Sequence, residues 1–413
     1  MTINFNFFTK LSIFIFLLAI FSYVFYFSLN NIINAWTYTE IHINYNLGFS
    51  KRGLLGSIML YLKSIGISKN IFFSSIFYLI TLLNIFLFLN LLNRFVKNHI
   101  FIYIFFALSP ALLLFSFYDL GGYARSESFG ISICLLHALF AQKLYNQKIN
   151  YQEYLKKTVL FIFPLSFLVV LIHELNILFL SFHFFTAFLI VYQNQFKYLN
   201  EFKFLIIFNF FLITFLIYLL ISHPFTKEFA KELYETLPEK DGTSIWIWNS
   251  ISMSFFERIN GEMASMLNPN AITLYFIIFS FYFFPIFFLL KITSENHKFQ
   301  LLNVGLSIIP FLILFFIGRD WGRWIHIILM VLFACFIQFK ERKIIIPKNY
   351  TYKILTYLFI AFFIFQFAFT RLPHCCNLVK LNLNIIGGLI PKVEVFYKIF
   401  KNNYDVKKRF NTY

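Results

Sequence analysis

Two arginines and an aspartate stand in the heptapeptide GRDWGRW, which separates two strongly apolar stretches of the sequence. Arg319 and Arg323 are four residues apart, so at the start of a helix they would share one face. Two forked guanidinium groups on one face form a clamp for phosphate, and Asp320 is placed to orient them. Trp321 and Trp324 are of the residue type that anchors a helix at a membrane interface. The heptapeptide therefore predicts either an anion site or an interfacial anchor.

Ionisable residues also gather in three other motifs that lie between apolar stretches. The motifs are NYNLGFSKRGLLG, YDLGGYARSES and HELN, with the residues Lys51, Arg52, Asp119, Arg125, Glu127, His173 and Glu174. In the first motif, glycines flank Arg52 and would let backbone amides approach a bound anion. The structural alternative is that Lys51 and Arg52 extend their long side chains to the membrane interface, where they reach water.

The other two motifs each have a structural and a functional interpretation. Asp119, Arg125 and Glu127 would either form an ion-pair network at helix ends or bind a charged ligand. His173 and Glu174 would either satisfy each other in a core or act on a proton. Two enzyme classes are excluded, because HELN lacks the second histidine of a zinc-protease helix and the chain has no GxxxxGK[ST] phosphate loop. The sequence predicts no metal site and no cofactor.

The composition indicates the class of protein that must position these residues. Of 413 residues, 60% are hydrophobic and 13% are charged, whereas a soluble globular protein has about 25% charged residues. The chain is therefore expected to be an integral membrane protein. Its formal charge is +17, but Lys and Arg stand in short clusters between apolar stretches and form no basic stripe. Nucleic acid is excluded as a partner on this pattern, and the lipid bilayer is the expected one.

Transmembrane helices are expected to account for most of the chain. About 20 apolar residues cross the hydrocarbon core, and shorter helices are allowed within a bundle. The sequence predicts about eleven spans, with a range of about ten to twelve, at 12–29, 71–92, 100–118, 129–142, 158–172, 175–192, 204–222, 271–290, 300–317, 325–339 and 354–370. The expected fold class is all-α, a polytopic integral membrane helical bundle with re-entrant or amphipathic segments on its outer face.

One long apolar stretch, 158–192, is interrupted only by HELN. A single helix of about 35 residues would be about 50 Å long, against about 30 Å of hydrocarbon. Two short helices that meet near the outer surface fit better. This hairpin also keeps the basic cluster that begins at Lys340 on the inner side, as the positive-inside rule requires.

Basic residues in short loops predict the orientation of the chain. With a cytoplasmic N-terminus, the inner loops hold the basic clusters at 143–157 and 340–353. All four charged motifs then fall on the outer side. The chain is expected to be a single transmembrane domain, 1–413, with an enlarged periplasmic loop at about 223–270 and a basic C-terminal tail at about 391–413. The expected location is the inner membrane of a bacterium.

A lipid-linked glycan matches such residues at an outer membrane face. Its polyprenyl tail lies in the bilayer, its two phosphates lie at the interface within reach of arginines, and its sugar enters the water. Transfer of the sugar requires a base for the acceptor hydroxyl and positive charge to stabilise the departing diphosphate. The residues expected to bind this substrate are Arg52, Arg125, Arg319, Arg323 and Asp320.

The base must accept a proton although arginines are near. Asp320 lies between two arginines, whose charges hold it ionised, so it is expected to orient guanidinium groups. Asp119 lies close in sequence to Arg125 and is a candidate of second choice. His173 and Glu174 have no basic neighbour in sequence and lie at an apolar hairpin tip, where burial makes a carboxylate a better proton acceptor. The predicted catalytic residues are therefore Glu174 and His173, with Asp119 as the alternative.

The layout resembles that of a known family. The Phe- and Ile-rich composition, the many spans, the enlarged outer loop and the outer-face arginines are similar to those of Wzy-type O-antigen and capsular polysaccharide polymerases. The arginines that match this pattern are Arg52, Arg125, Arg319 and Arg323. The resemblance implies polymerisation of undecaprenyl-diphosphate-linked repeat units without a metal, with a chain-length regulator and a flippase as partners. The chain departs from the family in its enlarged loop, where Arg258 is the one arginine.

Three alternatives stay open at this point. The chain is also similar to GT-C membrane glycosyltransferases, which use an acidic residue in an outer loop; Asp119 or Glu40 would match, and the acceptor would differ. A flippase for the same lipid-linked unit would need ionisable residues along a central path inside the spans. A structural assembly subunit is the remaining alternative.

Overall fold

The computed structural model describes most of the chain as far as residue 338. The described residues are 5–30, 35–96, 100–118, 123–222, 225–237, 245–254, 297–318 and 320–338, with single residues and short pieces between 256 and 285 and between 354 and 361. Every regular element among them is a helix, and none of these residues lies in a strand. Helices suit this sequence, because a helix satisfies its own backbone hydrogen bonds where no water is present.

Six helices are long and apolar enough to cross a membrane. They are Asn6–Leu29, Lys69–Phe95, Glu127–Tyr145, Tyr151–Ile172, Glu174–Gln193 and Leu199–Ser222. Two shorter apolar helices, Leu301–Phe316 and Trp321–Ile337, accompany them. The class of a helical protein with several membrane-spanning segments is thus supported. The count of about eleven stays a prediction, since the predicted spans 271–290 and 354–370 lie mostly outside the described residues.

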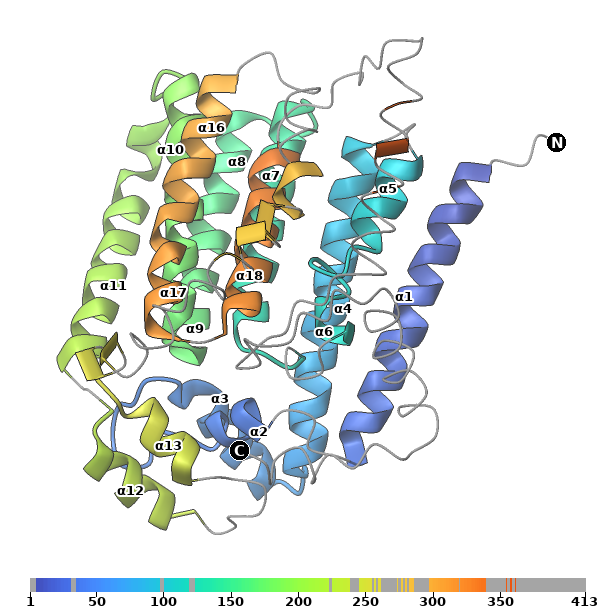
Figure 1. The fold of residues 1–413 in the computed structure, drawn as a ribbon. Coiled ribbons are helices and arrows are strands. Elements are labelled where there is room, and N and C mark those ends of the chain that lie inside the picture. Colours follow the sequence, from blue (N-terminus) through green and yellow to red (C-terminus); the bar gives the residue numbers. More distant parts are fainter. Residues whose placement is uncertain are drawn as a thin grey trace.

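The bundle is built on helices that run roughly side by side (Figure 1): α1 (Phe5–Asn30), α4 (Lys69–Phe95), α7 (Glu127–Tyr145), α10 (Phe179–Gln193), α16 (His297–Ile308) and α18 (Trp321–Ile337). Helix α4 packs between α1 and α7, and α18 contacts α4, α7, α10 and α16. All residues of α18 except His326 are buried. Phe333 of α18 stacks on Phe88 of α4, with ring centroids 4.0 Å apart. Helix α18 therefore forms the centre of the bundle.

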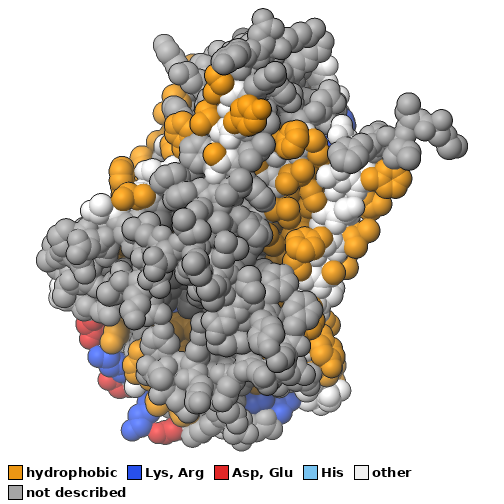
Figure 2. Space-filling view, turned by 45° about the vertical axis from the view of Figure 1, so that its right-hand side comes forward, with side chains coloured by type: hydrophobic (Ala, Val, Ile, Leu, Met, Phe, Trp, Pro, Cys, Tyr) orange, Lys and Arg blue, Asp and Glu red, His pale blue; other side chains and the backbone are white. Residues whose placement is uncertain are grey.

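The outer surface of the bundle is apolar. On α11 (Lys203–Ser222), Phe204, Phe210 and Ile221 are exposed over most of their area. Figure 2 shows apolar side chains over the helical part of one face and charged side chains gathered at its lower end. Such a surface is too large and too apolar to face water, so lipid is its natural surrounding.

The predicted span 100–118 is wrong as a single helix. The structure has α5 (Ile100–Ala107) and the short α6 (Phe115–Tyr118), with turns between them. Pro110 explains the break, because proline has no N–H and keeps the preceding Ser109 out of the helical conformation. The carbonyl oxygen of Ser109 instead accepts turn hydrogen bonds from the amides of residues 112 and 114.

The stretch 158–192 forms two helices, as its length predicts. The elements in chain order are α8 (Tyr151–Lys157), the π-turn η2 (Thr158–Ile162), α9 (Phe163–Ile172), the 3₁₀ turn η3 (Glu174–Leu178) and α10. The helical path breaks at His173, whose backbone is extended with φ −159° and ψ 125°. The HELN motif therefore lies at a turn between two long apolar helices.

Short helices cover one end of the bundle (Figure 1): α2 (Ala35–Glu40), α3 (Gly53–Ser64), α12 (Lys227–Glu235) and α13 (Ile245–Ile251). Trp248 of α13 is fully buried, and its ring contacts those of Phe225 and Tyr234. The amphipathic α12 buries Ala230 and Leu233 in the same small core. The described part of the enlarged loop is thus a folded cap. Arg258 lies outside the described residues.

Reporter fusions test the predicted topology. The turn between α7 and α8 and the start of α18 lie at opposite ends of the bundle in Figure 1. Fusions after Lys148 and after Gly322 should therefore report opposite sides of the membrane, with Lys148 in the cytoplasm. The same reporter signal from both positions would contradict the arrangement.

Candidate functional site

Charged side chains from separate segments meet at the capped end of the bundle. We call this group the ion cluster: Glu40, Lys51, Arg52, Arg125, Glu127, His173, Glu174, Asp320 and Arg323. Several members stand where helices begin: Arg52 precedes α3, Glu127 opens α7 and Asp320 precedes α18. The structure thus brings together all predicted site residues that it describes. Asp119 and Arg319 lie outside the described residues.

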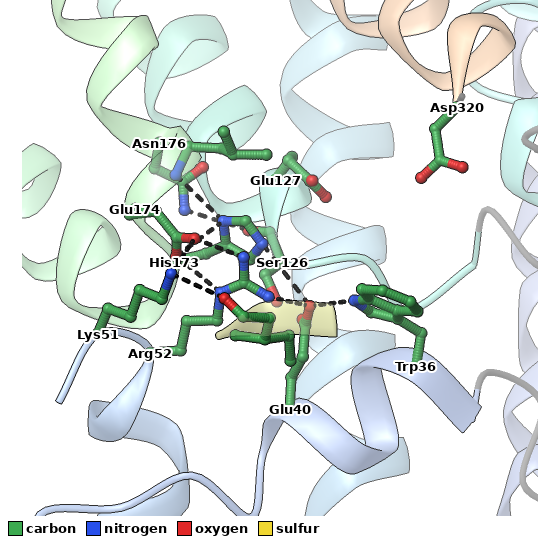
Figure 3. Close-up of polar contacts among 12 residues, drawn as sticks. Trp36, Glu40, Lys51, Arg52, Ser126, Glu127, His173, Glu174, Asn176 and Asp320 are labelled. Atoms are coloured by element: carbon green, nitrogen blue, oxygen red, sulfur yellow. Dashed lines mark hydrogen bonds and ion pairs between the residues drawn. The ribbon is translucent and has the colours of Figure 1, made fainter. Parts of the chain in front are cut away.

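Arg52 lies at the centre of a closed ion network (Figure 3). Its Nε donates to Oε2 of Glu174 at 2.7 Å, its Nη2 to Oε1 of Glu174 at 2.5 Å, and its Nη1 to Oε1 of Glu40 at 2.5 Å. Trp36 also donates its indole N–H to Glu40. Burial lowers the pKa of Arg52, but Glu174 and Glu40 together raise it above its usual value. Arg52 is therefore a permanent cation whose three nitrogens all have partners.

The backbone around Arg52 is unusual. Arg52 has φ 66°, in the left-handed region, which costs about 1–3 kcal/mol for a residue other than glycine. The ion pairs just described help to hold this conformation. One turn later, Gly56 lets α3 approach the turn at residues 41–43, because a Cβ atom there would overlap the carbonyl oxygen of Ile43. Close packing at Gly56 thus positions Arg52.

Glu174 differs from its sequence-based prediction. The sequence shows no basic neighbour, but the fold places Arg52 in a two-point contact with it and Lys51 Nζ 3.9 Å away. Paired, parallel N–H···O bonds favour the ionised carboxylate and make it a poor proton acceptor. The choice of Glu174 as the base is therefore corrected. In this structure it is the partner that holds Arg52.

His173 is also engaged within the network. Its Nδ1 accepts the backbone N–H of Leu175 at 3.1 Å, which assigns the ring proton of the neutral form to Nε2. That Nε2 faces Oε1 of Glu40 at 3.8 Å. Burial and the nearby Arg52 lower the pKa of His173. A neutral ring in this tautomer presents a donor to the cluster, so His173 is suited to orient Glu40 and not to accept a proton.

Arg323 and Asp320 lie at the start of α18, on the other side of the cluster. Nη2 of Arg323 is 2.8 Å from Oδ2 of Asp320 and 3.6 Å from Oε1 of Glu127. The guanidinium lies over the ring of Trp324, 4.2 Å from its centroid. The expected contact between Asp320 and a neighbouring guanidinium is thus present. Residues that are three apart at a helix start lie on the same face, which explains this contact.

Arg125 completes a pair of buried cations. Arg125 and Arg323 are both less than 10% exposed. Burial and then the charge of Arg323 lower the pKa of Arg125, against the opposing influence of Asp320 and Glu127. Two guanidinium groups that repel each other in a buried site stabilise an added anion. The arrangement is therefore suited to phosphate.

Two acidic members of the cluster lie outside the main set of predicted catalytic residues: Glu40 is predicted only under the GT-C alternative, and Glu127 only as part of an ion-pair network or a charged-ligand site. Glu40 is 5% exposed and Glu127 is 3% exposed. A signal for each exists in the sequence: Glu40 is a lone acid in the segment between two spans, and Glu127 opens an apolar helix. Neither signal distinguishes a paired carboxylate from an unpaired one, which only the fold reveals.

Comparisons with family models, curated proteins and solved structures find no match. Function is therefore inferred from the residues of the ion cluster, their charges and their contacts. The resemblance to polysaccharide polymerases stays a prediction.

A glycine substitution tests how α3 is positioned. Gly56→Ala should lower the melting temperature and the yield of folded protein, because the added Cβ would overlap the backbone of Ile43. Gly305→Ala in α16 is the matched control, since a Cβ there meets nothing within 4 Å. Equal melting temperatures for the two variants in detergent would contradict the close approach.

Removal of the central cation tests the closed network. Arg52→Ala should destabilise the protein by roughly 3–5 kcal/mol, because it removes the cation that donates to both Glu40 and Glu174. Lys227→Ala, which breaks the exposed pair with Glu257, should have little effect. Thermal unfolding of both variants in the same detergent provides the comparison. An Arg52→Ala protein as stable as the control would show that the network does not hold the fold.

Proposed function

We propose that the protein is a membrane glycosyltransferase that polymerises polyprenyl-diphosphate-linked oligosaccharide units at the capped end of its bundle, in the bacterial inner membrane. One observation supports this most directly: the buried pair Arg125 and Arg323 lies beside carboxylates at an end of apolar, lipid-facing helices. A diphosphate needs such cations, and sugar transfer needs such carboxylates.

The diphosphate is the part of the substrate that the cluster fits best. Arg323 is a planar fork held in place by Asp320 and by the face of Trp324, so its orientation is set before a ligand arrives. A departing diphosphate gains negative charge as the bond to the sugar breaks. Fixed cations next to it stabilise that charge without rearrangement. Arg125 and Arg323 are thus the proposed ligands of the phosphates.

Arg52 has a different proposed role, which is structural. All three of its guanidinium nitrogens donate to Glu40 or Glu174, so a phosphate would have to displace a carboxylate to reach it. Its contribution is to fix α3 and the HELN turn around the substrate. Arg319 and Asp119 remain candidates on sequence grounds alone.

The lipid tail and the partners follow from the same proposal. Exposed apolar residues of the bundle, such as Phe210 and Ile221 on α11, offer a surface for polyprenyl chains within the bilayer. A polymerase of this kind would receive its units from a flippase and act with a chain-length regulator. Both partners are proposed from the family resemblance.

A GT-C-type transfer to a different acceptor is the second candidate. Glu40 favours it, because this buried acid lies in the segment between the first two long helices. Its carboxylate, however, already accepts from Arg52 and Trp36. A flippase would instead show the same positions open alternately to both sides of the membrane in cysteine labelling.

Replacement of Arg323 by lysine tests phosphate binding. Lysine keeps the charge but loses the fork, so Arg323→Lys should cost about 1.5–3 kcal/mol of transition-state stabilisation, which is a tenfold to roughly hundredfold loss of polymer. Arg94→Lys, at the far end of α4, is the matched control and should leave polymer unchanged. Polymer is measured on gels at equal protein level. Normal chain length from Arg323→Lys would argue that this residue only anchors the helix.

A further inference from the structure

Two buried charged residues of the ion cluster have side-chain atoms that lack hydrogen-bond partners. Neither carboxylate oxygen of Glu127 has one among the described residues, and neither has Nε of Arg323. Glu127 is 3% exposed and Arg323 is 8% exposed, so bulk water has little access to their unpaired atoms. In Figure 3, Glu127 stands apart from the network around Arg52, and its carboxylate points toward the side on which Asp320 lies.

Arg52 and Glu127 differ in how completely their side chains are paired. Every guanidinium nitrogen of Arg52 donates to a carboxylate. Among the described residues, the ion-pair contact of Glu127 is the one to Nη2 of Arg323 at 3.6 Å, which is beyond hydrogen-bond distance. A buried carboxylate without hydrogen bonds is costly to the folded state. Native proteins leave few such groups, and those that remain call for an explanation such as a ligand.

The unpaired oxygens of Glu127 and the unpaired Nε–H of Arg323 define which chemical groups such a ligand would carry. Glu127 opens α7 and Arg323 lies in the first turn of α18, and these two helices pack against each other. The carboxylate can only accept, and Nε–H of the guanidinium can only donate. A ligand that satisfies both brings a hydrogen-bond donor for Glu127 and an acceptor oxygen for Arg323, and an acceptor hydroxyl placed beside a glycosyl diphosphate presents both groups.

We infer that Glu127 is the proton acceptor of the proposed glycosyl transfer and that Nε–H of Arg323 binds an oxygen of the departing diphosphate. This inference rests on the proposed function. The acceptor O–H proton passes to Glu127, and the acceptor oxygen forms its bond to C1 of the donor sugar. The bond from C1 to the phosphate oxygen breaks, and its electron pair leaves with the diphosphate. Glu127 then returns the proton to the diphosphate or to water.

The other described carboxylates of the cluster are already engaged. Glu174 and Glu40 accept from Arg52, and Asp320 lies 2.8 Å from Arg323. When the diphosphate binds, its charge offsets that of Arg323. Binding of the diphosphate thus reduces the net positive charge that faces Glu127 from Arg323, at the moment when the acceptor hydroxyl is present.

The test separates binding from chemistry. The protein in lipid nanodiscs is titrated with farnesyl diphosphate as the probe, and polymer is measured in cells that express each variant. Glu127→Gln should bind the probe as the wild type does, yet should lose polymer by roughly a hundredfold or more, as expected for removal of a general base. Single units should accumulate on the lipid carrier. Glu153→Gln, in α8 at the other end of the bundle, is the matched control with both properties intact.

The possible outcomes distinguish failure of the proposed function from failure of the role of Glu127. A wild-type protein that does not bind the probe overturns the proposed function itself. A wild type that binds, together with a Glu127→Gln variant that still makes polymer, overturns only the role of Glu127. Loss of probe binding in a folded Glu127→Gln protein shows that Glu127 merely positions Arg323, which also overturns its role as base.

A second variant covers the case in which Glu127→Gln does not fold. Glu127→Asp keeps the charge opposite Arg323 but withdraws the carboxylate by one methylene. It should bind the probe normally and make polymer at a rate lower by about tenfold or more, because proton transfer depends on reach. Wild-type polymer from Glu127→Asp at normal protein level would overturn the assignment.

Discussion

The pairing of one buried guanidinium group holds the capped end of this molecule together. Arg52 is removed from water, and a buried cation is tolerated only where carboxylates meet it. Glu40 arrives from α2 and Glu174 from the turn between two long helices, so the charges join three segments that also share an apolar core. The left-handed backbone of Arg52 is held by the same contacts. The pairing thus adds a polar link between α2, the start of α3 and the HELN turn.

The same rule explains why the neighbouring part of the cluster is the proposed reaction site. Around Arg52, each donor has an acceptor and the arrangement is closed. Around Glu127 and Arg323, charges of opposite sign face each other at 3.6 Å without a hydrogen bond. A network in which every donor and acceptor is paired resists rearrangement, whereas a network with unpaired donors and acceptors can bind a ligand. The closed part around Arg52 thus supports the part around Glu127 and Arg323 that is proposed to react.

Helix ends deliver these groups to one place. The break at His173 turns the chain between two membrane helices and presents Glu174, and the start of α18 presents Arg323 from the centre of the bundle. Because α18 is buried along nearly its whole length, its first turn has little freedom to move. The cap formed by α12 and α13 adds a contact, since Lys51 donates to the backbone of Ile251 at 3.0 Å.

Hydropathy and helix length depend only on neighbouring residues in the sequence. They determined the all-helical membrane class and the hairpin in 158–192, because a bilayer imposes the same requirement on every span. The same reasoning overlooked the break at Pro110 within an apolar stretch. Charge counting also predicted that the motifs share one end of the bundle. Which charges pair was decided only by tertiary structure: Arg52 and Glu174 are 122 residues apart, and Glu127 is left open beside Arg323. Electrostatic pairing acts through space, so pairs between distant segments cannot be read from the sequence, whereas the local pair of Asp320 and Arg323 can.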